Sequence, residues 1–479
     1  MTESSLIAQD DLPPWESIGR RWKGLAVLLV GQAMGSWGAA AMSVAAPRVG
    51  SALSLPAGEM QLVASGFSFG LTTFLVAGAR LGAAGQRRWF RHGALLLALS
   101  GLISAFALTW WMLFAGQLLA GIGAAILVPQ VLSLIQIRFS GAARAIAVSL
   151  YTMSLGAGVA GGLLVSGLLM STIGGALGWR VTFLLYTPVG LWLALGATRW
   201  LIRPEPADTP RLDRGGLVLF SLSLSLLTVT LSFGSHAGWP IWSVITGLAS
   251  LAGLALFALY ELSLARRGHQ PLLDVGLLAS SVVSPSLYVV MVSMGGYGTL
   301  VYVLSLYLQK GAGFIVLDAA LTFSAYALSF AAVNLLWTKL PLRWHRWVSP
   351  AALAVLSLSQ ALLLTVTGPV PALPELLILL ALSGLSHGAG FGALVARLTA
   401  MVPLDKVPSV SALINTAAQL GVFLGIAFLG GLYAGATTPN SPASYASALV
   451  LVLPVLSLLS ALALLCSIWV CSRPRVDAL

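Results

Sequence analysis

The stretch SLGAGVAGGLLVSGLLMSTIGGALGWRVTFLLYTPVG, residues 154–190, decides the fold class of this 479-residue chain. Its first half is apolar and holds two pairs of small residues at i,i+4 spacing, Ala157–Gly161 and Gly158–Gly162. On a helix such pairs share a face, and in lipid that face lets a second helix approach closely, because lipid tails give helices no hydrophobic drive to associate. The second half, beginning with Gly-Trp-Arg, starts a new apolar segment. The stretch therefore predicts closely packed helices in a polytopic membrane protein.

The composition indicates the same class of protein. Hydrophobic residues make up 58% of the chain and charged residues 8%, whereas soluble domains carry about 25% charge. The net charge of +11 comes from Lys and Arg scattered between apolar segments, so we interpret them as topology signals rather than as a nucleic-acid site. Cys466 and Cys471 lie in the last apolar segment, where packing thiols are the ordinary interpretation. Residues 1–23 lack a signal-peptide core, which predicts an uncleaved first anchor.

About 20 apolar residues cross a bilayer core, and on that measure the chain contains fourteen spans. We place them at 24–47, 59–82, 94–112, 114–136, 145–171, 179–201, 215–236, 241–263, 284–308, 316–338, 348–367, 375–398, 407–434 and 444–471. The predicted fold class is an all-α polytopic membrane protein. Six spans precede and six follow the two spans within 215–263, which contain few polar residues. This order suggests a 6+2+6 arrangement of helices, and paired halves are typical of transporters.

Lys and Arg test this layout. With the N-terminus in the cytoplasm, alternating segments place 22 of the 25 Lys and Arg residues inside, and only Arg48, Arg180 and Lys310 outside. Such a bias is a strong positive-inside signal, and one missed span would reverse every later loop and erase it. We therefore expect both termini in the cytoplasm. The expected units are a tail 1–23, a six-helix bundle 24–201, a loop 202–214, a two-helix insert 215–263, a loop 264–283, a six-helix bundle 284–471 and a tail 472–479.

No enzyme constellation is evident in the sequence. All fourteen acidic residues fall in loops, in tails or in the end turns of spans. A charge at the bilayer centre costs about 2.5–3.5 kcal/mol and usually has a function where it occurs. The paired acids or His/Glu ligand sets that membrane transferases and metalloproteases need are absent from the sequence. We expect no enzymatic activity, no cofactor, no metal site and no nucleic acid; the expected partners are a small-molecule substrate and membrane lipid, with protons as a further candidate.

His387, in SGLSHGAGFGALVAR (383–397), is the side chain deep in a span that titrates nearest to neutral pH. Glycines surround it, at 384, 388, 390 and 392. Two interpretations stay open. His387 either binds a proton or contacts substrate in a flexible helix, or it is a neutral histidine that forms a hydrogen bond across helices.

Uncharged polar and aromatic side chains inside the spans form the candidate substrate cavity. An amide in lipid needs a partner, so interhelical hydrogen bonding is the alternative role for each of them. The tyrosines either stack on a ligand or pack and anchor the helices. Asn415 and Gln419 share a helix face at i,i+4 spacing. The candidate set is Gln32, Ser36, Trp37, Gln117, Gln130, Tyr151, Tyr297, Tyr302, Asn334, His387, Asn415 and Gln419.

Several segments resemble the fourteen-helix drug:proton antiporter branch of the major facilitator superfamily, over essentially the whole chain. AGIGAAILVPQVLSLI (120–135) is similar to its fourth helix, GAGVAGGLL (156–164) to the antiporter motif of its fifth, and GWRVTFLLYTPVGL (178–191) to its sixth-helix entry. The resemblance implies the major facilitator fold in the bacterial cytoplasmic (inner) membrane and export of drugs or metabolites by alternating access. It assigns helix packing to Gly156, Gly158, Gly161 and Gly162, and cytoplasmic gating to Arg80, Gly85, Arg87 and Arg88.

The departures from the family pattern bear on proton coupling. The first-helix Asp of the family falls at Gly38, the fourth-helix Arg at Gln117 and the antiporter-motif Pro at Gly158; no gating Asp occurs between 80 and 91. Proton antiport therefore follows from the resemblance alone, with His387 as the candidate coupling residue. A cavity without fixed acids favours neutral or amphiphilic substrates over dications. An uncoupled facilitator or lipid-moving transporter, and a non-transporting scaffold or sensor, are the alternatives.

Overall fold

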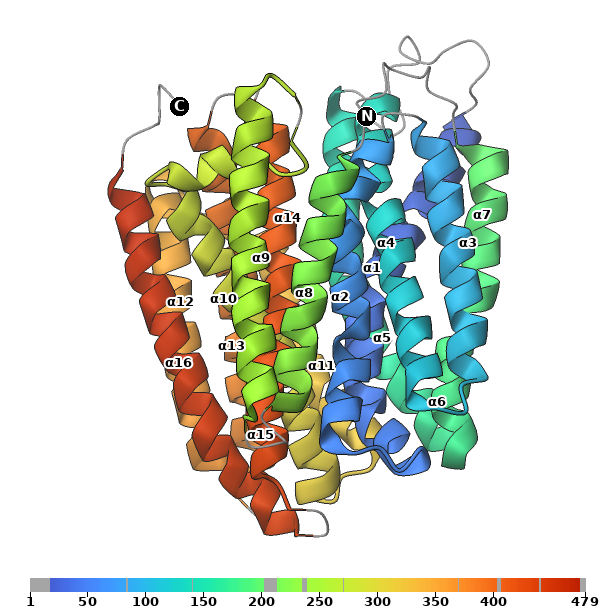
Figure 1. The fold of residues 1–479 in the computed structure, drawn as a ribbon, viewed down its shortest axis with the longest axis vertical. Helices are drawn as coiled ribbons and strands as arrows, with labels where there is room; N and C mark the ends of the chain where they lie inside the picture. The colour runs from blue at the N-terminus through green and yellow to red at the C-terminus, as the bar shows by residue number, and fades with distance from the viewer. Residues whose placement is uncertain are drawn as a thin grey trace, which may run out of the picture.

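The computed structural model is helical throughout its described elements (Figure 1). It describes residues 18–82, 85–139, 141–201, 213–234, 239–269, 271–368, 370–402, 406–438 and 441–473. Within those ranges, eleven helices are long and apolar enough to cross a membrane. The all-α polytopic class is therefore confirmed, and the finer count of fourteen spans stays a prediction.

The first group of helices covers the N-terminal part of the chain. It comprises α1 (Ile18–Ala52), α2 (Ala57–Gly82), α3 (Gln86–Ala105), α4 (Trp110–Arg138), α5 (Gly141–Ile173), α6 (Gly175–Leu184) and α7 (Tyr186–Trp200). Helix α4 packs against α2 and α3, α3 against α7, and α1 against α5. Gly174, with a φ of 66°, turns the chain between α5 and α6, a conformation that glycine adopts without a steric penalty.

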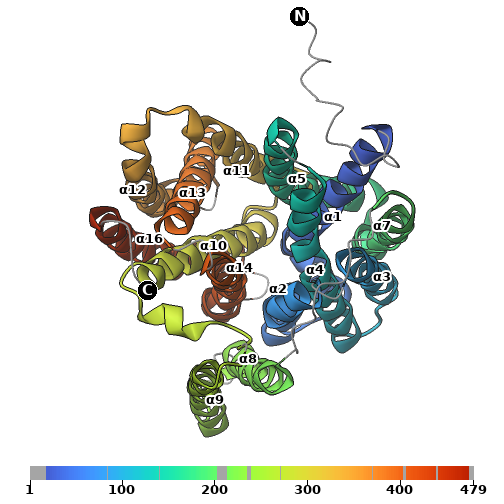
Figure 2. The ribbon, with the colours of Figure 1, turned by 90° about the horizontal axis from the view of Figure 1, so that it is seen from above.

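The remaining helices form a pair and a second group. They are α8 (Arg214–Gly234), α9 (Ile241–Arg266), η3 (Val275–Ala279), α10 (Val283–Leu306), η4 (Tyr307–Gly311), α11 (Val316–Leu336), η5 (Trp337–Lys339), α12 (Leu342–Val366), α13 (Leu373–Met401), α14 (Val407–Leu424), η7 (Gly425–Gly430), α15 (Gly431–Ala436) and α16 (Pro442–Ser472). The segments η4 and η7 are π-helical continuations of α10 and α14. Seen from above, α1–α7 lie on one side, α10–α16 on the other, and α8 and α9 at the edge beside α2 and α14 (Figure 2).

One face of α5 lies against the backbone of α1. A Cβ added to Gly158 would lie 2.8 Å from Ala33 Cα and would overlap the Ala33 carbonyl, and a Cβ on Gly162 would lie 2.8 Å from the Trp37 carbonyl oxygen. Gly161 lies under the Trp37 ring instead. These approaches need glycine, because any side chain would force α1 away.

A second small-residue face of α5 meets α11, in the other group. A Cβ on Gly156 would lie 3.0 Å from Ala331 Cβ, and a Cβ on Gly167 would lie 2.5 Å from Ala320 Cβ. The expected close packing therefore occurs on two faces of α5, one toward each group of helices. Ala157, paired with Gly161 in the sequence pattern, is exposed.

The Gly-Trp-Arg triplet ties α6 to the end of α3. Arg180 Nη1 donates hydrogen bonds to the carbonyl oxygens of Ala105 (2.7 Å) and Ala107 (2.8 Å), and its guanidinium lies 4.3 Å from the centroid of the Trp179 ring. Carbonyls at a helix C-terminus lack intrahelical donors, so a cation is favourable there. The triplet is thus an interhelical cap.

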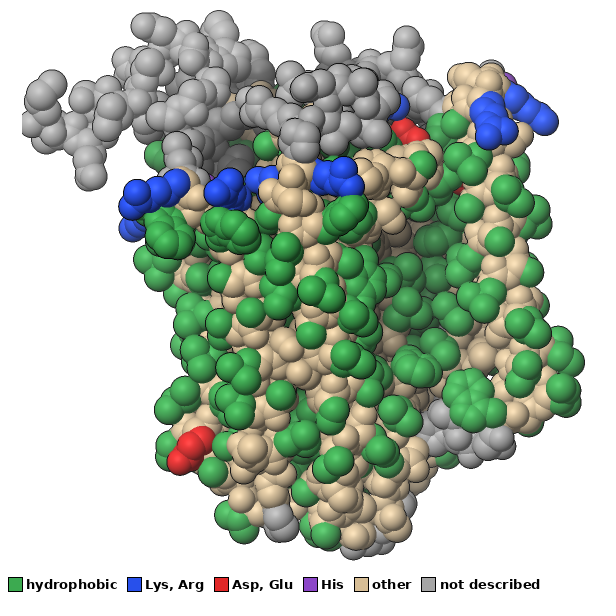
Figure 3. Space-filling view, turned by 90° about the vertical axis from the view of Figure 1, so that its left-hand side faces the viewer, with side chains coloured by type: hydrophobic (Ala, Val, Ile, Leu, Met, Phe, Trp, Pro, Cys, Tyr) green, Lys and Arg blue, Asp and Glu red, His purple; other side chains and the backbone are tan. Residues whose placement is uncertain are grey.

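The start of α1 and the end of α16 lie at the same end of the molecule (Figure 1). On the side formed by α12 and α16, Lys and Arg side chains make a row near that end, above a broad hydrophobic surface (Figure 3). A hydrophobic band bounded by basic residues is the pattern of a protein that spans a bilayer with its basic end in the cytoplasm.

Candidate functional site

His387 lies near the middle of α13 within a cluster of aromatic rings. Its Nδ1 forms a hydrogen bond with the Tyr326 hydroxyl of α11. Tyr297 of α10 stacks on Tyr326 with centroids 5.8 Å apart, and Phe330 meets the imidazole edge-on at 5.3 Å. Tyr326 and His387 are each 3% exposed, whereas Tyr297 is half-buried. The sequence analysis singled out His387 and Tyr297 but missed Tyr326, which forms the hydrogen bond to His387, and Phe330, which packs against its ring.

The second nitrogen of this histidine has no protein partner. His387 Nε2 is buried and makes no hydrogen bond within the described residues. When the Tyr326 hydroxyl donates to Nδ1, the ring proton of the neutral imidazole is on Nε2, which is then a donor without an acceptor. A buried donor of this kind favours an incoming acceptor, such as a substrate carbonyl or a water molecule.

The polar residues of α1 make a second unsatisfied group. Gln32 is 2% exposed, and its Oε1 has no donor among the described residues; Nε1 of Trp37, which can only donate, is buried and has no acceptor among them. Ser36 is half-buried one turn after Gln32. Helix α1 packs against α5 and also against α10 in the other group. These side chains therefore lie on a helix that joins the two groups.

Two other predicted cavity residues form hydrogen bonds within the N-terminal group. Gln130 Nε2 donates to the carbonyl oxygens of Gly78 (2.8 Å) and Ile126 (3.0 Å), which links α4 to α2. Gln117 is fully buried and its Nε2 lies 3.4 Å from Ser104 Oγ of α3. The geometry matches the interhelical alternative for both amides.

The remaining predicted cavity residues do not gather at one point. Tyr302 is fully buried beneath η7, where its ring would lie 2.9 Å from a Cβ on Gly430. Asn334 and Asn415 each donate to a carbonyl of their own helix, at 2.7 Å and 3.0 Å. Tyr151 and Gln419 are half-buried. The contacts observed for Tyr302, Asn334 and Asn415 are therefore packing and hydrogen bonds within a helix rather than the lining of a shared cavity.

Two glutamine side chains, unnoticed in the sequence, join the groups at the end opposite the termini. Gln61, near the start of α2, donates through Nε2 to the Ala427 carbonyl of η7. Gln309 in η4 donates to Val44 O of α1 at 3.3 Å and to Ser305 Oγ at 2.9 Å. The sequence signal that could have identified Gln61 is its position as an amide side chain inside the predicted span 59–82. Its partner is a carbonyl more than 360 residues away, which local spacing does not reveal.

At the end of the molecule where α1 begins and α16 ends, several arginines donate hydrogen bonds to backbone carbonyls of their own group of helices. Arg21 Nη2 donates to Arg138 O at 2.6 Å, and Arg138 Nη1 to Trp200 O at 2.9 Å, which joins α1, α4 and α7. Arg397 Nη2 donates to Cys471 O at 3.1 Å, which joins α13 to α16. These bonds hold each group together without joining one group to the other.

The predicted gating residues span the end of α2, which holds Arg80, and the start of α3, which holds Arg87 and Arg88, with Gly85 between the two helices. Gly85 has a φ of 131°, which only glycine adopts readily. Arg87 donates to the Thr198 carbonyl of α7, and Arg88 is exposed. The side chain of Arg80 lies outside the described part of the structure. The segment is thus fixed to α7 by Arg87.

An acidic pair lies outside the two groups. Glu261 of α9 is fully buried, although the sequence indicates an end-turn position, and its Oε2 accepts a hydrogen bond from Leu273 N at 3.0 Å. Asp213, the residue before α8, accepts a hydrogen bond from Tyr260 Oη through its Oδ1 at 3.1 Å. The buried Oε1 of Glu261 and Oδ2 of Asp213 have no hydrogen-bond partner among the described residues.

Comparison with known proteins gives the family. A model of the Major Facilitator Superfamily matches residues 28–314 and 286–477. The chain belongs to the Major Facilitator Superfamily. A solved relative in fold, a bacterial homolog of the human lysosomal transporter Spinster in an inward-facing, unoccupied conformation, superposes with a TM-score of 0.67 at 16% identity, covering 95% of this chain and 98% of that one.

Among sequence relatives of this superfamily member, antibiotic transporters recur. The chain is 31% identical to the probable actinorhodin transporter of Streptomyces coelicolor, across 90% of this chain and 75% of that protein. It is 31% identical to the puromycin resistance protein pur8 of Streptomyces alboniger (87% and 83%) and 28% identical to the cephamycin export protein CmcT of Amycolatopsis lactamdurans (85% and 83%). The resemblance to the drug:proton antiporter branch is confirmed, and the protein is a multi-pass membrane transporter.

Proposed function

We propose that this transporter exports hydrophobic or amphiphilic small molecules across the bacterial cytoplasmic membrane by alternating access. The observation that carries the proposal is the similarity, over most of the chain, to relatives named for antibiotic export and resistance. The substrate is either a drug or an endogenous metabolite. Enzymatic activity forms no part of the proposal.

In this proposal the chain crosses the membrane fourteen times. Helices α6 and α7 make one span, and α14, η7 and α15 make another. Counted in this way, α1–α7 supply six spans, α8 and α9 supply two, and α10–α16 supply six. The six-helix bundles are residues 24–201 and 284–471, and residues 215–263 form the insert. The position of the start of α1 and the end of α16 at one end of the molecule supports an even number of spans.

The proposed substrate contacts lie where the bundles face each other near mid-helix. In the C-terminal bundle they are Tyr297 and His387, with Tyr326 as the group that orients the imidazole; in the N-terminal bundle they are Gln32 and Trp37. Unpartnered atoms on His387, Gln32 and Trp37 support this choice. These groups offer aromatic surface and neutral hydrogen bonds and no carboxylate. They suit a neutral or amphiphilic aromatic molecule, because a dication would lose its hydration without compensation.

Alternating access is supported by the placement of the contacts between the bundles. Gln61 and Gln309 join the bundles at the end opposite the termini, while Arg138 and Arg397 bind within single bundles at the other end. This arrangement fits a state open toward the cytoplasm. Export requires the reverse state, in which the Gln61 and Gln309 bonds break.

Proton antiport is the proposed coupling, with His387 as its residue. Purified protein should release protons when a transported compound is added, and His387→Gln should abolish the release while the protein stays folded. Proton release that persists in His387→Gln would move the coupling to another group. No release at any pH, together with transport that needs no pH gradient, would favour the uncoupled facilitator, which Gly38 and Gln117 at the family's acid and Arg positions also favour.

A further inference from the structure

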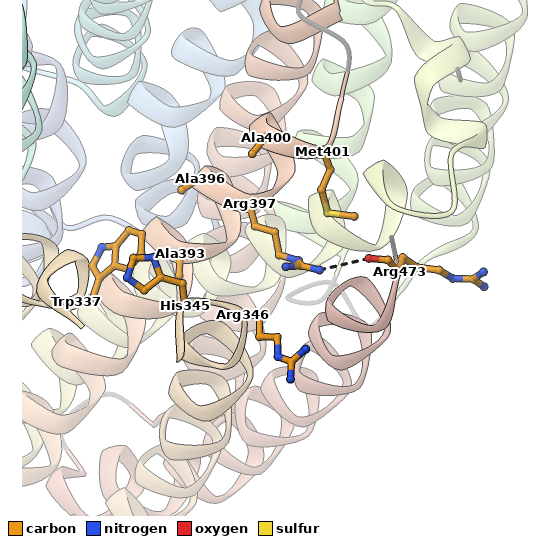
Figure 4. Close-up of a pocket in the computed structure, with 9 residues that line it drawn as sticks. All are labelled: Trp337, His345, Arg346, Ala393, Ala396, Arg397, Ala400, Met401 and Arg473. Atoms are coloured by element: carbon orange, nitrogen blue, oxygen red, sulfur yellow. Dashed lines mark hydrogen bonds between the residues drawn. The ribbon is translucent and has the colours of Figure 1, made fainter. Parts of the chain in front are cut away.

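The cytoplasmic end of the C-terminal bundle contains a basic hollow that includes none of the proposed substrate contacts. It has a volume of about 320 Å³, at the lower end of the range for ligand pockets. Its lining comes from η5, α12, α13 and the residue that follows α16 (Figure 4), and consists of Trp337, His345, Arg346, Ala393, Ala396, Arg397, Ala400, Met401 and Arg473. Three of the lining side chains are arginines, Arg346 in α12, Arg397 in α13 and Arg473 directly after α16, and no lining side chain is acidic.

The hydrogen bonds at this hollow join the helix ends that carry the arginines. Arg397 Nη2 donates to the Arg473 carbonyl at 3.4 Å and to the Cys471 carbonyl at 3.1 Å, and Cys471 Sγ donates to the Arg346 carbonyl at 2.8 Å. The ends of α12, α13 and α16 are thereby joined. Arg397 Nε is buried and has no acceptor among the described residues. Guanidinium groups stay charged at any physiological pH, and no acidic side chain lines the hollow to offset the positive charge of its three arginines.

The surroundings are those of a lipid interface. Helices α12 and α16 lie at the outer edge of the C-terminal bundle, away from α1–α7 (Figure 2). Trp347 and Trp469 are 45% and 48% exposed, and the Arg346 and Arg473 guanidiniums lie 5.4 Å and 4.1 Å from the centroids of these rings. Exposed tryptophans next to basic groups are typical of the headgroup level of a membrane.

We propose that this hollow binds a phosphate-bearing anion. Arginine matches phosphate oxygens in a bidentate manner, and basic pockets between helices on the cytoplasmic side suit anionic lipid headgroups. The same chemistry is offered by soluble phosphate. The alanines and Met401 of α13 supply an apolar wall, which the glycerol or the first methylenes of a lipid would contact. The site is independent of the proposed substrate pathway.

The test is native mass spectrometry of the purified full-length protein with cardiolipin, and with phosphatidylcholine as the neutral lipid. The variant is Arg346→Gln/Arg473→Gln, which leaves Arg397 and all the carbonyl hydrogen bonds in place. The matched control is Arg343→Gln, an exposed arginine on the first turn of α12 that does not line the hollow. The loss of two guanidinium charges should weaken cardiolipin binding about thirtyfold, with phosphatidylcholine unaffected.

A second measurement separates the two sources of phosphate. Inorganic phosphate, at constant ionic strength, is added to wild type and to the double variant during thermal unfolding. A rise in the melting temperature of wild type alone, with cardiolipin binding equal in all variants, assigns the site to soluble phosphate. Cardiolipin binding that is equal in all variants, without any effect of phosphate, overturns the proposal; so does an equal loss in Arg343→Gln.

Discussion

Gly158→Ala tests the close contact between α5 and α1. The new methyl group would lie 2.8 Å from Ala33 Cα, well inside van der Waals contact, and the obstacle is backbone that no rotamer change can move. Alanine is favoured over glycine in a helix by about 1 kcal/mol, whereas forcing a methylene into a packed interface costs about 1–3 kcal/mol. The steric cost should therefore exceed the propensity gain, and α1 must shift away.

The assay is thermal unfolding of the purified protein, followed by tryptophan fluorescence. The matched control is Gly435→Ala in α15, where a Cβ would meet nothing within 4 Å and the substitution gives only the propensity gain. Gly158→Ala should lower the apparent melting temperature, and Gly435→Ala should leave it unchanged or raise it. Equal or higher stability of Gly158→Ala relative to Gly435→Ala would refute the proposed contact between α5 and α1.

Three further predictions concern interhelical hydrogen bonds. Arg180→Lys should lower the apparent melting temperature, because one ammonium does not reproduce the two guanidinium bonds at the end of α3, a loss of about 1 kcal/mol; an unchanged melting temperature would contradict the cap. Gln61→Leu should increase the spin-label distance between the ends of α2 and α15, and the same distribution as in wild type would show that the bond does not hold that end closed. Tyr326→Phe should weaken substrate binding while leaving the apparent melting temperature nearly unchanged, because it removes the hydrogen bond to His387 without opening a cavity. A substrate dissociation constant equal to that of wild type would show that Tyr326 does not contribute to the site.

The sequence was sufficient for features that depend on length and local spacing. A 20-residue apolar run is enough for a membrane helix, and the glycines of 156–167 predicted close packing before any partner was known. Which partner each glycine meets was not predictable. Gly158 and Gly162 face α1, while Gly156 and Gly167 face α11, because the face depends on a rotation of α5 that is set by its neighbours.

The candidate site was predicted only in part, because its contacts join helices far apart in the chain. His387 was found as a buried titratable group, but its partner Tyr326 is 61 residues away and has no sequence motif. Gln130 appeared equally suited to a cavity, and the structure instead places it between α2 and α4. Glu261 was assigned only to the end turn of a span, and its hydrogen bond from Leu273 N was not predictable, because Leu273 lies in the segment that follows α9.

The most direct test of the proposed function is transport into proteoliposomes that carry the purified protein and an imposed pH gradient. Two aromatic compounds of similar size are compared, one neutral and one dicationic. The account predicts that the neutral compound accumulates in response to the gradient and that the dication does not, because the proposed contacts include no carboxylate. Accumulation of the dication without the neutral compound would contradict the substrate class, and accumulation of neither would contradict export of aromatic molecules.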